Sequence, residues 1–403
     1  MNVDTMRKID YFVGLPLAWI LTGFVKLAGL AKSPSATPVK NILFIELSEM
    51  GSTLIADPAM RKAQDHFKAK LFFLIFDRNK VSLSLLNTIP ENQIFTIRED
   101  NLWHFAEDVF RFIFWARQQK IDSCFDLELF SRATALLSVF SGAKNRIGFD
   151  AFHNEGLSRG RLLTHRVAYN SHTHMAKNFI ALVNALISNN QEVPYSKTLI
   201  TDDEIKLTQV TVSEDQLNKV QDKIKAVFPS YNAAEDQIVL INPNASDLLP
   251  QRRWPKAHFK VLIQSILAHY PKALVLITGA PAEKAEAEEL VQSVQQARCV
   301  NFAGQVKFVE LIPLYFIAKI MVTNDSGPGH FSSITPLATI VLFGPETPTL
   351  YASLGNSTPI FLGLACSPCV SAANHRKTPC QNNVCMQLMQ PELVMREVKR
   401  ILP

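Results

Sequence analysis

Short apolar segments alternate with helical segments through both halves of this chain. The predicted strands are residues 42–47, 71–76, 94–97 and 123–127 in the first half, and 238–241, 274–277, 300–302, 320–322 and 339–343 in the second. Repeated strand–helix units favour parallel sheets covered by helices on both faces. Ligands of such sheets bind beyond the carboxyl ends of the strands. The alternation therefore predicts an α/β fold whose binding sites lie in the turns after the strands.

Length and composition agree with a globular protein of more than one domain. The chain has 403 residues, of which 47% are hydrophobic and 19% are charged, and this length exceeds that of one ordinary domain. A formal net charge of +5 suits anionic substrates or an anionic membrane surface, but specifies neither. We expect no nucleic-acid partner. The predicted parts are an N-terminal segment and linker at 1–38, a first domain at 39–190, a polar linker region at 191–237, a second domain at 238–363 and a cysteine-rich tail with a closing helix at 364–403.

The N-terminal segment has an uncharged apolar stretch at residues 11–25, with basic residues on both sides. A spanning helix usually needs about 20 apolar residues, and Pro16 is expected to interrupt this one. A signal peptide would need a better cleavage site than Gly29-Leu30-Ala31. We favour an interfacial segment, with Tyr11 and Trp19 at the level of the headgroups, over a helix docked on the protein. The protein would then be peripheral to, or anchored at, a membrane on its cytoplasmic side.

The turn after the predicted strand 320–322 concentrates polar groups where a helix begins. It reads NDSGPGH and contains Asp325, Ser326, Gly327 and His330. Unpaired backbone N–H groups and the helix dipole favour an anion at such a position. Glycine also lets a phosphate approach the backbone closely. This turn is therefore a candidate phosphate or nucleotide site.

Two other turns of the second half have similar chemistry. Ser246 and Arg252 follow the strand 238–241, and a hydroxyl with a guanidinium group can hold phosphate. Glu283 follows the strand 274–277, where an acid can bind ribose hydroxyls or simply favour the start of a helix. Because the carboxyl ends of parallel strands share one edge of a sheet, the three turns are expected to converge.

Four of the six cysteines lie in the tail. Cys366, Cys369, Cys380 and Cys385 have spacings that could suit zinc, although the second spacing is loose. Our preferred interpretation is a reduced, structural role. Cys124 and Cys299 lie in apolar runs and are expected to be small buried hydrophobic residues.

These motifs together resemble glycosyltransferase family 9, the heptosyltransferase-like enzymes of lipopolysaccharide assembly. The resemblance is carried by LSEMGS at 47–52, NPNAS…RRWP at 242–255, NDSGPGH at 324–330, LFGPETP at 342–348 and the tail. It implies a GT-B architecture, with two facing Rossmann-like domains and a cleft between them. It also implies a nucleotide-sugar donor, typically ADP-heptose, in the second domain and a lipid-linked saccharide acceptor in the first. The last helix would lie back near the first domain.

By this resemblance, the turn residues of the second half would surround the donor. Asp325, Ser326, Gly327 and His330 would surround the diphosphate. Its oxygens would be bound by Ser326 with the following amides and, from the other side, by Ser246 and Arg252, while Glu283 would contact the ribose. The family usually has lysine where Arg252 stands, and the two cations differ in geometry. No metal or other cofactor is required by these residues.

The turn after the first strand departs from the family pattern. The family places an aspartate, resembling a general base, directly after Gly51, whereas this chain has Ser52. Serine cannot act as that base unaided, so Glu49 is our candidate replacement, with Glu46 and Asp57 behind it. The expected reaction is inverting transfer of a sugar, with a base that removes the proton of the acceptor hydroxyl and fixed cations that stabilise the departing diphosphate.

Three alternatives compete with this interpretation, and two of them remain open. The chain could be a pseudoenzyme that binds nucleotide sugars and lacks the usual catalytic aspartate. It could be a nucleotide-sugar epimerase or hydrolase on the same fold. An NAD-dependent oxidoreductase is disfavoured, because no G-x-G-x-x-G follows a predicted strand.

Overall fold

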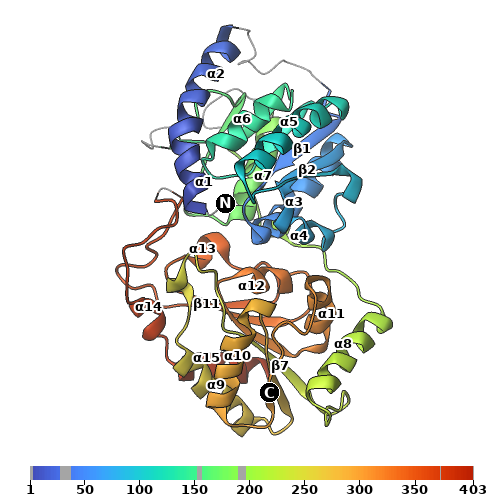
Figure 1. Cartoon of the computed structure of the whole chain (residues 1–403), viewed down its shortest axis with the longest axis vertical. Helices are drawn as coiled ribbons and strands as arrows, with labels where there is room; N and C mark the ends of the chain where they lie inside the picture. Colours follow the sequence, from blue (N-terminus) through green and yellow to red (C-terminus); the bar gives the residue numbers. More distant parts are fainter. Residues whose placement is uncertain (1–2, 28–37, 152–156, 189–196, 373, 403) are drawn as a thin grey trace. The chain divides into compact units, whose positions relative to one another are not determined.

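The computed structural model describes residues 3–27, 38–151, 157–188, 197–372 and 374–402. The chain forms two compact units, Met1–Lys206 and Leu207–Pro403, drawn in blue to green and in green to red in Figure 1. Residues 28–37 of the predicted N-terminal segment and linker lie outside the described residues, as do residues 191–196 of the predicted interdomain region. The predicted domain boundaries stay predictions.

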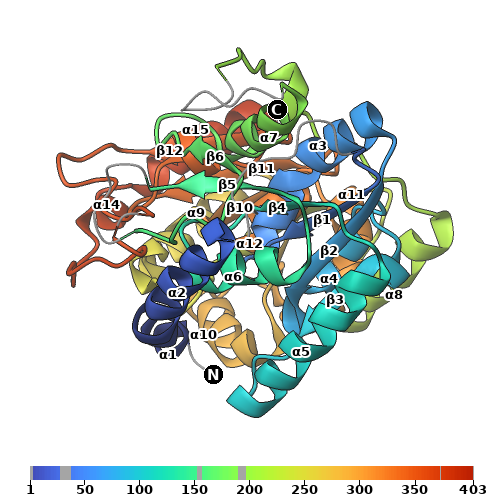
Figure 2. The same cartoon turned by 90° about the horizontal axis from the view of Figure 1, so that it is seen from above.

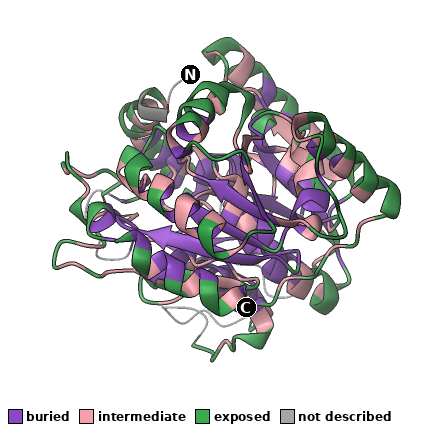
Figure 3. Cartoon of the chain, turned by 90° about the horizontal axis from the view of Figure 1, so that it is seen from below, coloured by how far each residue is buried: buried purple, intermediate pink, exposed green. Residues whose placement is uncertain are grey.

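The N-terminal unit is built on a six-stranded parallel sheet. Its strands are β1 (Asn41–Ile45), β2 (Lys70–Phe76), β3 (Ile94–Ile97), β4 (Ser123–Asp126), β5 (Asn145–Asp150) and β6 (His165–Ala168), in the order β3-β2-β1-β4-β5-β6. The longer helices are α3 (Met50–Phe67), α5 (Leu102–Gln118), α6 (Arg132–Phe140) and α7 (Met175–Ile187), with short α4 (Val81–Ser84). Helices α5 and α6 pack on one face of the sheet, and α3 packs against α7. The strands are buried and the outer helix surfaces are exposed, as Figure 3 shows.

The C-terminal unit repeats this plan. Its strands are β7 (Gln237–Asn242), β8 (Ala273–Ile277), β9 (Cys299–Asn301), β10 (Ile320–Asn324), β11 (Ala338–Phe343) and β12 (Ser357–Phe361), in the order β12-β11-β10-β7-β8-β9. All pairs are parallel. The helices are α8 (Glu214–Val227), α9 (Lys256–His269), α10 (Lys284–Val294), α11 (Leu311–Ile317), α12 (Gly327–Ser332), α13 (Pro348–Tyr351), α14 (Val384–Gln387) and α15 (Pro391–Ile401). The predicted α/β fold with parallel sheets is confirmed.

Strands β5 and β6 lie where the sequence shows a basic run, and no strand was predicted there. Arg146, Arg159 and His165 are 3%, 4% and 1% exposed. The Arg146 guanidinium donates to the carbonyls of Leu162 and Ala143 at 2.7 and 2.8 Å. Burial, and then the charge of Arg146, lowers the pKa of His165 to about 4. Arg146 and Arg159 are therefore part of the core, because carbonyl and carboxylate groups hydrogen-bond both guanidinium groups, whereas Arg161 and His172 of the same basic run are exposed.

The N-terminal segment is helical as far as Leu27. Helix α1 (Val3–Ile9) continues through the π-helical turn η1 (Asp10–Gly14) into α2 (Leu15–Leu27). The expectation that Pro16 interrupts the helix is wrong. Proline lacks an N–H and clashes with the carbonyl four residues back, and the wider π turn directly before it relieves this conflict without ending the helix.

The closing helix α15 packs in the core of the C-terminal unit, and its expected position near the first domain stays a prediction. Val394, Met395 and Val398 are buried in the cluster that includes α9 and strands of the second sheet. The Tyr270 hydroxyl donates to the carbonyl of Leu402 at 2.6 Å. The apolar stripe of this helix thus completes the cover of its own sheet.

Candidate functional site

Asp325 and Arg252 meet at the carboxyl edge of the second sheet. Asp325 directly follows β10, and Arg252 ends the short 3-10 turn η5 (Pro250–Arg252) after β7. The Arg252 Nε atom lies 3.3 Å from the Asp325 Oδ2 atom, and the two side chains are 19% and 6% exposed. Neither of these atoms makes a hydrogen bond. Because buried charged groups are normally hydrogen-bonded, the pair has capacity left for a ligand.

Glu346 is a third charged residue of this cluster, and sequence reasoning assigned no role to it. It follows β11 and is 1% exposed. Its Oε2 atom lies 3.9 Å from both Arg252 Nη2 and Arg376 Nε and makes no hydrogen bond. Burial raises the pKa of Glu346 to about 7, against the lowering effect of Arg376. The signal in the sequence was its place beyond a predicted strand, in the LFGPETP segment.

Arg376 comes from the tail and is the fourth charged residue of the cluster. Its guanidinium carbon lies 4.6 Å from the centre of the Tyr351 ring, a distance suited to a cation–π contact. The cluster of Arg252, Asp325, Glu346 and Arg376 therefore contains two cations and two acids, all within the C-terminal unit. Nothing in the spacing of the sequence places residue 376 beside residue 346.

Asn324 holds the loops around this cluster in place. It ends β10 and is fully buried. Its Oδ1 atom accepts a hydrogen bond from the backbone N–H of Trp254 at 3.1 Å, and its Nδ2 group donates to the carbonyl of Pro243 at 2.8 Å. One amide thus joins the strand end, the loop after β7 and the start of α9, because it can donate and accept at once.

Glu283, which is predicted to contact the ribose, lies in the short 3-10 turn η6 (Pro281–Glu283) after β8 of the same unit. Its Oε2 atom accepts from the backbone N–H of Ala280 at 2.6 Å. A Cβ atom on Gly279 would lie 2.8 Å from Asn244 Nδ2 and 2.9 Å from Glu283 Oε2, so any larger residue there would displace the ends of these two side chains. The Asn244 Nδ2 atom is buried without a hydrogen bond. Asn244, which was not assigned a role, thus offers an unused donor beside Glu283.

The remaining predicted donor residues lie around the turn after β10 and the loop after β7. Ser326 is the N-cap residue of α12, and its hydroxyl donates to the carbonyl of Asn324 at 3.2 Å. Gly327 opens the helix, and His330 lies within it, partly buried. Ser246 is exposed, and its hydroxyl accepts from the Leu248 N–H at 3.3 Å. Their roles in binding a diphosphate stay predictions.

The turn after β1 gathers acids in the N-terminal unit. Ser52 lies in the first turn of α3, and its hydroxyl donates to Glu49 Oε2 at 3.0 Å. Glu128, which was not singled out from the sequence, accepts from the backbone N–H groups of Leu47 and Ser48 at 3.0 Å and from the Ser48 hydroxyl at 2.9 Å. Burial raises the pKa of Glu128, and the nearby Glu49 raises it further. Glu128 therefore fixes the backbone that carries Glu49.

The tail cysteines are all free thiols. Cys385 is buried, and burial raises the pKa of its thiol; charges at Cys369, Cys380 and Cys366 would raise it further. In the part of the chain that the structure describes, no group of three or more His, Cys, Asp or Glu side chains is placed to hold a metal ion. The zinc hypothesis stays a prediction. Cys124 and Cys299 are buried, as expected.

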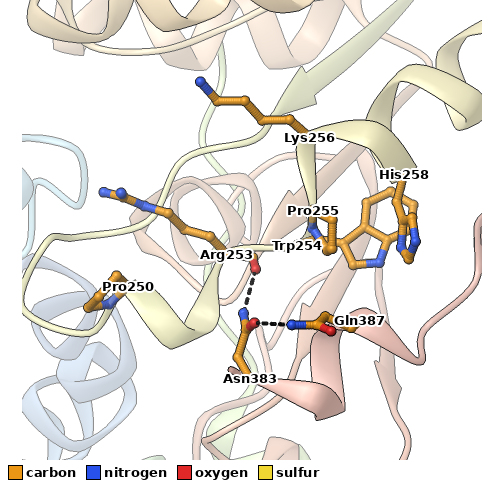
Figure 4. Close-up of a pocket in the computed structure, with 8 residues that line it drawn as sticks. All are labelled: Pro250, Arg253, Trp254, Pro255, Lys256, His258, Asn383 and Gln387. Atoms are coloured by element: carbon orange, nitrogen blue, oxygen red, sulfur yellow. Dashed lines mark hydrogen bonds between the residues drawn. The ribbon is translucent and has the colours of Figure 1, made fainter. Parts of the chain in front are cut away.

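An open pocket lies at the start of α9 (Figure 4). Its lining residues are Pro250, Arg253, Trp254, Pro255, Lys256, His258, Asn383 and Gln387, and none of them is a predicted site residue. The Asn383 side chain donates to the carbonyl of Arg253 at 3.0 Å, and so joins the tail to the loop that carries Arg252. The pocket therefore lies between the tail and the loop that carries Arg252 of the charged cluster.

The sequence matches the model of a known protein family over more than half of its length. The family model described as glycosyltransferase family 9 (heptosyltransferase) matches residues 117–378. Among curated proteins, lipooligosaccharide heptosyltransferase 2 of Campylobacter jejuni is 29% identical over 189 residues, which are 45% of this chain and 57% of the relative. Lipopolysaccharide heptosyltransferase 2 of Escherichia coli is 23% identical over 237 residues, 58% of this chain and 62% of the relative. The chain thus spans less than two thirds of the length of these relatives.

Solved structures share the fold over nearly the whole chain. The E. coli ADP-heptose lipopolysaccharide heptosyltransferase II superposes with a TM-score of 0.67 at 19% identity, covering 90% of this chain and 98% of that one. An E. coli heptosyltransferase solved with ADP gives 0.62 at 15% identity, covering 89% and 99%. These neighbours are GT-B proteins, so the predicted fold class is confirmed.

Proposed function

Because this chain belongs to glycosyltransferase family 9, the heptosyltransferase family, we propose that it transfers a sugar from a nucleotide-sugar donor to a glycan of the bacterial cell envelope. The donor would be an ADP-sugar, with heptose as the preferred sugar, since a structural neighbour was solved with ADP-2-deoxy-2-fluoro heptose. The acceptor would be a lipid-linked saccharide of the lipopolysaccharide type, as the names of the relatives indicate. The protein would act at the cytoplasmic face of the inner membrane.

The observation that carries this proposal is the buried charged cluster at Arg252, Asp325 and Glu346. One buried polar atom of each residue, namely Arg252 Nε, Asp325 Oδ2 and Glu346 Oε2, makes no hydrogen bond, and the cluster lies at the edge where ligands of parallel sheets bind. Arg252 would hold the donor diphosphate through its planar fork of N–H groups. Asp325 would accept hydrogen bonds from sugar hydroxyls, and Asn244 with Glu283 would contact the ribose.

The reaction we infer is a single displacement with inversion. The acceptor oxygen forms a bond to the anomeric carbon while the bond from that carbon to the diphosphate oxygen breaks. Glu49 takes the proton of the acceptor hydroxyl, and the nucleoside diphosphate leaves with its added charge stabilised by Arg252 and Arg376. Ser52 orients Glu49 through the hydrogen bond of 3.0 Å between them.

A pseudoenzyme that only binds nucleotide sugars is the second candidate. It is favoured by one observation, the hydroxyl of Ser52 at the position where the family has its base. Glu49 lies within hydrogen-bond distance of that hydroxyl, which supports an active enzyme in which the carboxylate is supplied from three residues upstream.

The test is a thermal-shift screen of the full-length protein with ADP-, UDP-, GDP- and CMP-sugars, followed by mass analysis of the products formed with a lipopolysaccharide-core acceptor. We expect an ADP-sugar to raise the unfolding temperature, and the acceptor to gain the mass of one sugar. Stabilisation without transfer would favour the pseudoenzyme. No stabilisation by any of the four donors would refute the donor site.

A further inference from the structure

Helix α5 has apolar side chains on two opposite faces. Its inner face packs on the sheet through Phe112 and Ala116, which are fully buried. Trp103, Phe110 and Phe114 on its outer side are 87%, 62% and 55% exposed. They are spaced seven and four residues apart, which aligns them along one face of a helix. The protein core does not account for this outer stripe, since the outer face of a surface helix is normally polar.

The N-terminal helix has the same unusual polarity. Its large exposed hydrophobic side chains are Tyr11, Phe12, Val13, Leu17, Trp19, Ile20, Phe24 and Leu27. Helices α1 to α2, from Thr5 to Leu27, form one segment that is long and apolar enough to cross a membrane. The helix nevertheless has a buried face on the protein, through Ala18, Thr22 and Val25.

Specific contacts fasten the N-terminal helix to the unit along its length. Asp10 Oδ1 accepts from the backbone N–H groups of Arg132 and Ala133 at 2.9 and 2.8 Å, at the start of α6. The Thr22 hydroxyl accepts from the N–H of Arg161 at 2.9 Å. A helix held in this way can enter a bilayer only with its outer face, as an interfacial helix does.

The two helices that carry these exposed side chains lie on the same side of the N-terminal unit. Phe112 and Ala116 of α5 and Leu137 of α6 share one core cluster on one face of the sheet. Helix α2 packs on α6 through Ala18 and Val25, and Figure 2 shows α6 between α2 and α5. Exposed Lys8 and Lys26 lie near the two ends of the N-terminal helix, where they suit anionic headgroups.

We propose that α5 and the N-terminal helix form one membrane-docking face for an anionic bilayer. The face consists of the eight exposed side chains of the N-terminal helix together with Leu102, Trp103, Phe110 and Phe114 of α5. These make up twelve of the eighteen large exposed hydrophobic side chains in the described residues. The inference deepens the membrane association in the proposed function, because it adds a second helix and gives the unit a fixed orientation on the bilayer.

Flotation of the full-length protein with vesicles of equal parts phosphatidylethanolamine and phosphatidylglycerol tests this face. The α5 variant Trp103→Ser/Phe110→Ser/Phe114→Ser should lower vesicle partitioning at least about tenfold, since each aromatic side chain loses apolar area that the bilayer would cover. Leu199→Ser is the matched control, because Leu199 is 89% exposed in the same unit but outside the face. It should partition like the wild type.

A second measurement keeps the test valid if the triple variant folds poorly. In a Trp19→Phe background, fluorescence quenching by brominated lipids should report Trp103 in the bilayer, because Trp115 is partly buried and Trp254 is fully buried. Vesicle binding by the folded α5 variant equal to that of the wild type, or no quenching of Trp103, would overturn the inference. So would an α5 variant that only dissociates a dimer in sedimentation and leaves vesicle binding unchanged.

The outcome is independent of catalysis. Vesicle binding is measured without donor or acceptor, and sugar transfer can be assayed separately with a delipidated, water-soluble acceptor. Transfer to that acceptor should be equal in the α5 variant and the wild type. Failure of transfer in both proteins would refute the proposed function and leave the docking face standing.

Discussion

At the residue scale, acids and cations are buried together at the ends of strands without full hydrogen bonding. Arg252, Asp325 and Glu346 all have atoms in this state. Burying a charge is costly unless partners compensate it, so groups left in this condition are typical of functional sites, where a ligand supplies the missing partners. A single residue also determines which group can act as the base, since Ser52 has a hydroxyl where the family has a carboxylate, and Glu49 is the proposed replacement.

Glu346→Gln should change the pH dependence of stability. The pKa of Glu346 is raised from its usual 4.5 to about 7, so this group contributes stability that is fully present below pH 4.5 and lost as the pH rises to about 7. Relative to the wild type, the free energy of unfolding of the variant should therefore rise across this pH range, by at most about 3 kcal/mol. Urea unfolding at several pH values measures the difference.

Asp108→Asn is the control with the opposite sign. Hydrogen bonds from Arg98 lower the pKa of Asp108, so its stabilisation is present at neutral pH and is lost on acidification. The wild type should exceed this variant at pH 7, and the gap should close as the pH falls below about 4. A Glu346→Gln gap that is constant with pH would contradict the assigned ionisation.

Glu49→Gln should lower the rate of transfer about 100-fold or more, the usual contribution of a general base, while the dissociation constant of the donor stays within about twofold. Steady-state kinetics and calorimetry with an ADP-sugar separate the two quantities. Glu91→Gln, an exposed acid of the same unit, should leave both unchanged. Unaltered turnover in Glu49→Gln would show that another group is the base.

At the scale of elements, the N-terminal helix is positioned by a polar contact and not by hydrophobic periodicity alone. Asp10 accepts hydrogen bonds at the first turn of α6 and pairs with Arg132 at 3.1 Å. An acid at this end of a helix satisfies free N–H groups and interacts well with the dipole. Helix α6 thus orients the apolar segment that precedes the first domain.

Asp10→Ala should lower the free energy of unfolding by about 1 kcal/mol, as the loss of a helix cap does. Chemical denaturation followed by circular dichroism gives this value. Asp65→Ala, at an exposed position of α3, should change stability far less. Equal effects of the two variants would mean that Asp10 does not hold the helix on the unit.

At the scale of the whole molecule, the predicted donor-binding residues all belong to the unit Leu207–Pro403, and the candidate base belongs to Met1–Lys206. A ligand stabilises the state to which it binds, by about 3 kcal/mol at 100 times its dissociation constant. Donor binding should therefore be visible in one unit without the other.

Hydrogen exchange with saturating ADP should protect the turns at 242–253 and 324–327 at least about tenfold, while the turn at 46–52 exchanges as before. Mass spectrometry of peptides reports both regions in one sample. UMP serves as the control nucleotide and should protect neither region. Protection confined to the turn at 46–52 would contradict donor binding in the C-terminal unit.

Much of the fold was predictable because its signals are local. Apolar runs such as Ile42–Leu47 and the turns after them define strand–helix units from composition alone. Strands β5 and β6 were missed because buried Arg146 and His165 resemble surface residues until their partners are known. In the site, Asp325 and Arg252 could be predicted from turn chemistry, whereas Glu346 and Arg376 could not, since their proximity to Arg252 depends on contacts between distant segments.

The sequence by itself determined the α/β class, the family resemblance and the strand ends that carry the polar turns. These follow from periodicity and from short motifs, which are properties of neighbouring residues. Only the tertiary structure decided which charges are buried together, that Ser52 donates to Glu49, and that α15 packs in the core of its own unit. It also showed that α5 and the N-terminal helix lie on the same side of the first sheet. Burial and proximity depend on how the chain packs, and no local pattern encodes them.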